Sequence, residues 1–196
     1  KMIQAPNRPL FVTLQSASIW GASDASASFS DCAIGGWFSF KANPLKSDVW
    51  WYMYQLNKKD HAWAFDKMSP MRRISAIELF GTIILVKHMM KHSQGALADI
   101  SLRIRSDNKG NTFAVRKQYA KKWPNSGLMM ELASLQHASG IEVNLRHVKR
   151  CSNVWADRLA ALDSSGFCKS KQLPSLDSVS DWIVLQTLLD IQSGVK

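Results

Sequence analysis

The sequence predicts a mixed α/β (α+β) domain in which helices flank a sheet of parallel and antiparallel strands. Three strand-like stretches come first, and stretches with helical periodicity then alternate with two further strands. A content of 46% hydrophobic and 20% charged residues is typical of a folded globular chain rather than a disordered one. A chain of 196 residues is long enough for one well-buried domain with an appended segment.

The strands follow from residue type and alternation. The predicted ranges are 17–24, 33–40, 50–56, 102–106 and 141–148. The third stretch is aromatic and apolar, a composition that favours strands, and the turn signal Asn43–Pro44 predicts that it pairs antiparallel with the second. In the last stretch Ile141, Val143 and Leu145 alternate with polar residues, which indicates a strand with one buried face.

The helices follow from a period of three to four residues and from their end signals. The predicted ranges are 73–91, 110–121, 126–138 and 153–162. The first is the clearest, with Ile77 and Ile84 on one apolar face. Pro124 separates the second helix from the third, since proline cannot continue a helix, and Gly140 ends the third.

The chain divides into three parts on composition. We expect a lead-in at residues 1–16, the mixed domain at 17–163, and a Ser- and Lys-rich linker with a C-terminal amphipathic helix at 164–196. Within the last part the helix is predicted at 180–191, with Trp182, Leu185 and Leu189 on one face.

Charge and cysteine content indicate the surroundings of the protein. Lys and Arg number 25 against 15 Asp and Glu, and the resulting net charge of +10 favours a polyanionic partner, although a solvated basic surface is the alternative. Cys32, Cys151 and Cys168 suggest neither a disulfide framework nor a zinc cluster, so we expect an intracellular, reducing compartment, cytoplasm or nucleus. The apolar run 83–86 is far shorter than the roughly 20 residues of a membrane span, so no membrane partner is expected.

Four acidic residues occupy informative positions. Glu78 lies inside the most apolar helix, where a carboxylate needs a cation, a hydrogen-bond network or a raised pKa; pairing with Arg73 is the simple alternative. Asp24 and Asp107 each come at the end of a strand, where ligands collect in open sheets. Asp157 lies on the last helix of the domain among alanines that let it approach the sheet. Each Asp alone also fits a turn or cap.

Four carboxylates in the order Asp, Glu, Asp, Asp suit phosphodiester hydrolysis. Two metal ions assist that reaction, one activating water and the other stabilising the leaving oxygen. Magnesium prefers oxygen ligands and keeps several waters, so a few carboxylates suffice as its protein ligands.

The ordered motifs resemble the ribonuclease H domain of retroelement (LTR-retrotransposon-like) reverse transcriptases. The most specific part is the run 147–159 (HVKRCSNVWADRL), which is similar to the family pattern of a strand-end His-Val, a short turn and Asn-x-x-Ala-Asp-x-Leu. The resemblance covers roughly residues 17–163. The other matching motifs are Asp24–Ala25–Ser26, Gly35–Gly36–Trp37, Ile77–Glu78–Leu79 and Ser106–Asp107–Asn108.

The resemblance implies a ribonuclease H-like fold, with a five-stranded mixed sheet flanked by helices. It implies an endonuclease that hydrolyses the RNA strand of RNA–DNA hybrids to 5′-phosphomonoesters, uses two Mg²⁺ or Mn²⁺ ions and follows a polymerase domain in a polyprotein. The implied catalytic and metal-binding residues are Asp24, Glu78, Asp107 and Asp157.

Further residues are implied to contact substrate or support the site. Ser26 and Asn108 belong to this group, as does Asn153, which either orients Asp157 from one turn away or caps the helix; the cap is favoured. His147, at a strand end, is expected to be structural or to contact substrate. Lys121 and Lys122 form a candidate hybrid-binding ridge, or else a solvated helix face.

Departures from the family leave a second interpretation open. Cellular ribonucleases H carry a His in the turn before the last Asp, and the turn 149–152 has none, which lowers the expected turnover. The alternative is a domesticated, non-catalytic domain that binds nucleic acid or protein in a larger assembly. A proofreading exonuclease would need Asp-x-Glu on the first strand, and a retroviral-type integrase would place its Glu last.

Overall fold

A computed structural model describes residues 19–65, 69–93 and 101–193, and the side chains as far as residue 190. The lead-in expected at residues 1–16 lies outside the described residues. The strands are β1 (Trp20–Ala27), β2 (Cys32–Ser39), β3 (Trp50–Leu56), β4 (Ser101–Ser106) and β5 (Glu142–His147). They form one sheet in the order β3-β2-β1-β4-β5, antiparallel from β1 to β3 and parallel from β1 through β4 to β5. The predicted five-stranded mixed sheet is confirmed.

The first strand continues beyond its predicted end. Asp24 pairs with Gly35 in the middle of β1, and pairing with β2 continues to Ala27 and Cys32. The expectation that the strand ends at Asp24 was therefore wrong, because the small residues after it fit the ladder as far as the tight turn at 28–31, where the Ser28 N–H donates to the Asp31 carbonyl. The pairing of β4 with β1 is described as far as Ala22 and Arg105, so Asp107 follows β4 at the level of Asp24.

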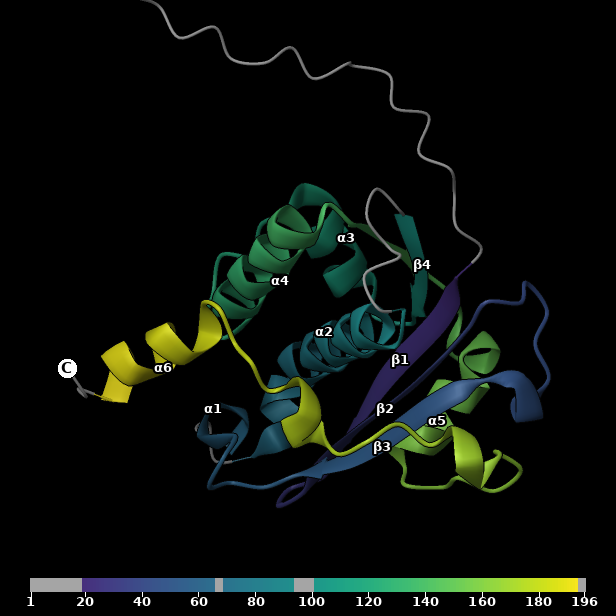
Figure 1. Ribbon diagram of the computed structural model, residues 1–196. Helices are drawn as coiled ribbons and strands as arrows, with labels where there is room; N and C mark the ends of the chain where they lie inside the picture. Colours follow the sequence, from purple (N-terminus) through teal and green to yellow (C-terminus); the bar gives the residue numbers. More distant parts are fainter. Residues whose placement is uncertain (1–18, 66–68, 94–100, 194–196) are drawn as a thin grey trace, which may run out of the picture.

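The helices cover both faces of the sheet (Figure 1). On one face lie α2 (Ile74–His92), α3 (Lys109–Lys117) and α4 (Asn125–Ser139), and on the other lies α5 (Val154–Ala160). These match the predicted helices to within a few residues at each end. A further short helix, α1 (Ala62–Phe65), follows β3 and was not among the predicted helices.

The main core forms around α2, which packs against β1, β2 and α4. This helix is apolar on nearly all sides, and every residue from Leu79 to Met89 is buried. Such a helix is stable only when other elements cover its whole circumference, and here the sheet, α4 and the C-terminal segment do so.

A second, smaller core lies between the sheet and α5. Gly35 allows the close approach, since a Cβ at this position would lie 2.3 Å from the backbone nitrogen of Ala160. Ala156 and Leu159 of α5 are fully buried against Trp37 and Trp51. The small residues of α5 thus bring its functional side chains down onto β1.

The C-terminal segment packs against the body of the molecule. Leu173, Val179 and Leu185 join the main core, although 164–178 was expected to be linker. The last helix, α6 (Leu185–Ser193), begins later than predicted and projects away from the sheet (Figure 1). None of the described helices is long and apolar enough to cross a membrane.

The start of α6 is held by a buried carboxylate. Glu131 on α4 is fully buried and accepts the backbone N–H groups of residues 183, 184 and 185 at 2.7–3.2 Å. The Lys87 ammonium lies 3.6 Å from Glu131 and donates to the Asp181 carbonyl at 2.7 Å. This polar junction joins α2, α4 and α6 and therefore ties the C-terminal segment to the core.

Candidate metal centre

Three of the four predicted carboxylates converge. Asp24 comes from the middle of β1, Glu78 from the second turn of α2, and Asp107 from the residue after β4. Each offers one oxygen, and these atoms lie within 4.8 Å of one another. The parallel pairing of β1 with β4 brings the two aspartates to the same level, and α2 crosses above them to supply the Glu.

Burial and mutual repulsion make the cluster unfavourable as a set of free anions. Burial raises the pKa of Asp24 to about 7, with the nearby Asp107 charge contributing in the same direction. Burial likewise raises the pKa of Glu78 to about 7, with Asp24 and Asp107 adding to the effect, while a hydrogen bond from Asn108 opposes it. Two carboxyls that resist ionisation near neutral pH form a site that a cation would stabilise.

Two oxygen atoms of the cluster also lack a hydrogen-bond partner among the described residues. Glu78 Oε2 and Asp107 Oδ1 are buried, and neither makes a hydrogen bond within the described part of the chain. An unsatisfied buried oxygen costs free energy, so it marks a place where a ligand belongs. Three hard oxygen donors within coordination reach fit a divalent cation such as Mg²⁺ or Mn²⁺.

Asp157, the fourth predicted ligand, lies close by but outside this group. Its Oδ1 accepts a hydrogen bond from Arg150 Nη2 at 3.0 Å, and its side chain is 41% exposed. The Asp157 charge still helps to raise the pKa of Asp24. In this structure Asp157 is paired with a guanidinium that also lowers the pKa of both Asp24 and Glu78.

Arg150 is the functional candidate that sequence reasoning missed. It lies in the turn 150–152 just before α5, the turn that was noted only for lacking a His. The acids at Asp157, Asp24 and Asp107 raise its own pKa. A cation one turn ahead of a helix that carries a candidate acid in its first turn was the signal available in the sequence.

Asn153 occupies the N-cap position of α5, but its side chain supports Asp24. The side chain is 2% exposed and makes no cap hydrogen bond, so the favoured side-chain cap was wrong. Its Nδ2 donates to the Ser23 carbonyl at 3.3 Å and to Asp24 Oδ2 at 3.5 Å. The contact described between Asn153 and the alternative partner, Asp157, is a backbone one, in which the Asp157 N–H donates to the Asn153 carbonyl.

Two other predicted substrate contacts, Asn108 and Ser26, make hydrogen bonds within the protein. Asn108 Oδ1 accepts the N–H of Asn111 and caps α3, which places the Asn108 amide beside Glu78. The Ser26 hydroxyl donates to the Ala160 carbonyl at 2.6 Å, so it joins β1 to the end of α5.

The predicted basic and imidazole groups remain at the surface. His147 is exposed at the end of β5, and Lys121 and Lys122 are exposed in the connection between α3 and α4. Glu78, for which pairing with Arg73 was the alternative, instead faces the charge of Arg150. The guanidinium of Arg73 donates to the Trp123 carbonyl at 3.1 Å.

Comparison with known proteins identifies the fold but no sequence family. No family model matches the sequence, and no curated protein matches it. Among solved structures, LC11-RNase H1, isolated from compost by a metagenomic approach and solved in complex with an RNA/DNA hybrid, is 14% identical with a TM-score of 0.57. The match covers 74% of this chain and 95% of that protein.

Two further structures agree. The N-terminal RNase H domain of Rv2228c from Mycobacterium tuberculosis is 16% identical with a TM-score of 0.55, covering 76% of this chain and 94% of that one. RNase H1 from the halophilic archaeon Halobacterium salinarum NRC-1 is 12% identical with a TM-score of 0.50, covering 73% and 94%. The chain therefore has the ribonuclease H fold, as the sequence motifs predicted.

Proposed function

We propose that this chain is a ribonuclease H, an endonuclease that hydrolyses the RNA strand of RNA–DNA hybrids with divalent metal. The observation that carries the proposal is the convergence of Asp24, Glu78 and Asp107 on one point of a ribonuclease H fold. The hybrid bound by LC11-RNase H1 supports the same substrate class. The net charge of +10 suits a double-stranded polyanion.

The residues of the cluster have distinct tasks in this proposal. Asp24, Glu78 and Asp107 would hold the cations, with Asp157 joining them as a fourth carboxylate. Two bound Mg²⁺ or Mn²⁺ ions supply an activated water and charge stabilisation at the leaving oxygen. Asn153 keeps Asp24 oriented. Glu78 would face the RNA strand near the 2′-hydroxyl, the group that distinguishes RNA from DNA.

Binding of the hybrid would use the exposed groups around this centre. In this proposal the exposed Lys121 and Lys122 neutralise phosphates, and Ser26, Asn108 and His147 are further candidate contacts. Phosphate neutralisation is sequence-independent, so affinity would depend on the salt concentration more than on the base sequence.

Strand-specific cleavage tests the proposed function. The chain is incubated with a hybrid labelled on either strand, beside single-stranded RNA and duplex DNA, in Mg²⁺, Mn²⁺ or EDTA. We expect cleavage of the hybrid RNA alone, ending in 5′-phosphates, and none in EDTA. Asp107→Asn and Glu78→Gln should abolish it while the circular dichroism spectrum is unchanged. Full cleavage in EDTA, or unchanged rates in both variants, would show that the cluster is not the catalytic centre.

One observation favours a second candidate, a domesticated domain that binds nucleic acid or protein without cleaving. Asp157 is held by Arg150 instead of joining the other acids. A non-catalytic domain would keep that ion pair in the presence of metal and substrate. Hybrid binding without cleavage in either metal would support this candidate.

The origin of the chain is a separate proposal. The run 147–159 suggests descent from a retroelement reverse transcriptase with a polymerase domain upstream. In that case the chain should bind a hybrid more tightly when it is joined to that polymerase than alone. Equal affinity in both contexts would argue for a free-standing domain.

A further inference from the structure

A cavity lies beside α5, on the face of the sheet opposite α2. Its volume of about 390 Å³ falls in the range of about 300–1,000 Å³ typical of small-molecule sites. Asn153, which holds Asp24 from the other side, is part of its wall, so the cavity adjoins the acid cluster without including it. Its remaining walls come from Trp20, Ala22, Trp37, the loop 42–44, Arg105, Ser152, Val154 and Trp155.

Three tryptophan rings and the guanidinium group of Arg105 belong to the lining. Trp37 and Trp155 meet edge to face, with ring centroids 5.2 Å apart. The guanidinium groups of Arg103 and Arg105 lie 5.1 and 5.5 Å from the centre of the Trp20 ring. Aromatic surfaces beside fixed cations are the combination with which proteins bind single-stranded nucleic acid, stacking the base and neutralising its phosphate.

Three buried polar groups in the lining lack a hydrogen-bond partner among the described residues. They are the indole N–H groups of Trp20 and Trp37 and the side-chain carbonyl oxygen of Asn153. Trp37 is 7% exposed and Asn153 is 2% exposed, so water satisfies neither well. The Asn153 amide nitrogen already donates toward Asp24, which leaves its carbonyl oxygen for something else. Two donors and one acceptor in the cavity wall are therefore available to a ligand that carries hydrogen-bond acceptors and a donor.

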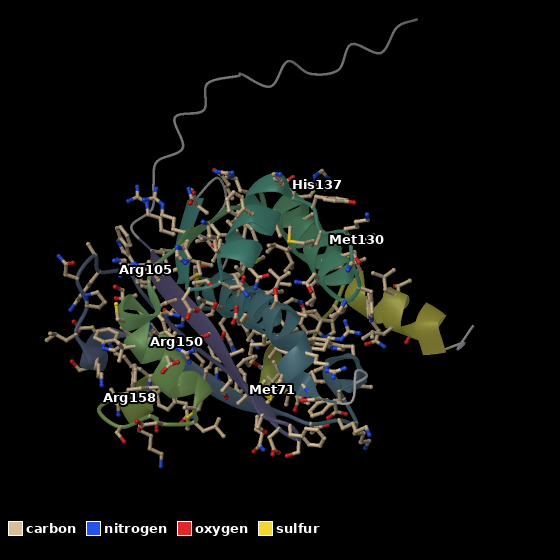
Figure 2. The ribbon with its side chains drawn as sticks, turned by 180° about the vertical axis from the view of Figure 1, so that it is seen from behind. Met71, Arg105, Met130, His137, Arg150 and Arg158 are labelled. Carbon is tan, nitrogen blue, oxygen red and sulfur yellow. The ribbon has the colours of Figure 1, made fainter. Side chains whose placement is uncertain are left out.

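The surface next to the cavity offers a path for a charged strand. The helix α5 packs on β1, β2 and β3. On the same face, β4 and β5 carry Arg103, Arg105 and the exposed Arg146, and no helix of the described residues packs over them with comparable contact. Figure 2 shows Arg105 and Arg150 on the side of the molecule that carries α5. Arg103, Arg105 and Arg146 thus place positive charge on the face of the sheet that carries the cavity.

We propose that this cavity binds one unpaired nucleotide of a single strand, with its base against a tryptophan ring of the lining and its phosphate at Arg105. A nucleobase presents donors and acceptors on the edge of a flat ring, as the orphaned indole and amide groups require. An acidic peptide would pair with the arginines but would bring no flat ring to the aromatic walls. Binding requires neither metal nor cleavage, so the proposal goes beyond the proposed ribonuclease activity.

The test compares ligands that differ only in their bases. Fluorescence anisotropy in EDTA measures binding of labelled single-stranded RNA of roughly ten nucleotides and of an abasic sugar–phosphate strand of equal length. We expect the RNA to bind about ten-fold more tightly, the size of one stacked base. Equal affinity for both strands, or equally strong competition by polyglutamate, would overturn the proposal.

Substitutions locate the binding. Ala42 is exposed at the mouth of the cavity, and Ala42→Trp should fill it and reduce RNA affinity to the abasic level. Arg105→Ala should weaken the binding of both the RNA and the abasic strand. Lys59→Ala, which removes an equal charge from a turn outside the cavity lining, should weaken the binding of each strand less. Asn43→Trp serves if Ala42→Trp fails to fold. Undiminished RNA binding in a folded cavity-filling variant would contradict the proposal, and cleavage plays no part in either readout.

Discussion

Asp24 and Glu78 derive their chemistry from where the backbone places them. Asp24 is 4% exposed in the middle of a paired strand, and Glu78 lies on a helix whose following residues are almost all buried. Neither site can hydrate a carboxylate well, so both pKa values rise to about 7. Without a cation, the folded state therefore penalises ionisation of these groups at neutral pH.

Replacing Asp24 should reveal this penalty through the pH dependence of stability. An acid whose pKa rises from 3.8 in the unfolded chain to about 7 in the folded one stabilises the fold while neutral, below pH 3.8. That contribution is lost as the pH rises to about 7. Asparagine cannot ionise, so in EDTA at about pH 8 the free energy of unfolding of Asp24→Asn should exceed that of the wild type by about 2–4 kcal/mol. Urea unfolding should show that this difference in stability vanishes in acid. A variant less stable than the wild type at about pH 8 would mean that Asp24 is an ordinary ion-pair partner.

Arg150 acts as an internal cation for the acids, and its removal should make metal binding tighter. Its charge lowers the pKa of Asp24 and Glu78 and its guanidinium holds Asp157. Arg150→Ala should leave more uncompensated negative charge and free Asp157, raising Mg²⁺ affinity several-fold in calorimetric titration. Arg158→Ala, which breaks the ion pair between Arg158 of α5 and Asp163 after the end of that helix, is the matched control. Equal or weaker Mg²⁺ binding in the Arg150 variant would refute this role.

The elements bring these residues together through close backbone contacts. Gly35 and the alanines of α5 allow the helix to lie directly on β1 and β2, which fixes the positions of Asn153 and Asp157. A side chain at Gly35 would meet the backbone of Leu159 and Ala160, which cannot rotate away. The second core and the site therefore depend on the same contact.

Gly35→Ala should consequently destabilise the fold and displace α5. Overpacking typically costs about 1–3 kcal/mol, and here the obstacle is backbone. Gly81→Ala is the control, because a Cβ there would lie 3.5 Å from its nearest neighbours, an ordinary contact, and alanine favours a helix. Urea unfolding should show a loss for the first variant and none for the second. Equal stability of both would mean that α5 docks less tightly than the structure shows.

At the junction of α4 and α6, Glu131→Gln should loosen the C-terminal helix. The carboxylate accepts three consecutive backbone N–H groups and faces Lys87, and removing one partner of a buried ion pair typically costs about 3–5 kcal/mol. Hydrogen exchange at residues 183–185 should accelerate. Glu142→Gln, on an exposed position of β5, should change nothing. Unaltered protection in the Glu131 variant would show that α6 is held by apolar contacts alone.

Local patterns predicted the elements well, and the long-range contacts less well. Alternation at 141–148 and the apolar face of 73–91 located β5 and α2, because these signals lie within one element. Asn153 was assigned to a cap since its neighbours in sequence suggested one, whereas its partner is Asp24, far away on β1. Glu131 lies in an apolar run as Glu78 does, so the same argument would have marked it as buried.

At the scale of the whole molecule, the fold gathers three acidic residues into a cluster within a protein of net positive charge. The net charge of +10 attracts a polyanion, while the acids converge on one buried point that alone would repel it. Bound divalent metal would reconcile these two properties. The fourth carboxylate, Asp157, remains paired with Arg150, and its entry into the cluster is part of the proposed function.

The melting temperature with and without metal tests the central claim most directly. If Asp24, Glu78 and Asp107 hold divalent cations, Mg²⁺ at 10–100 times its dissociation constant should stabilise the wild type by about 1–3 kcal/mol, a shift of roughly 2–12 °C. Asp107→Asn, which removes one ligand, should lose most of that shift. A wild type whose melting temperature is the same in Mg²⁺, Mn²⁺ and EDTA would contradict the account.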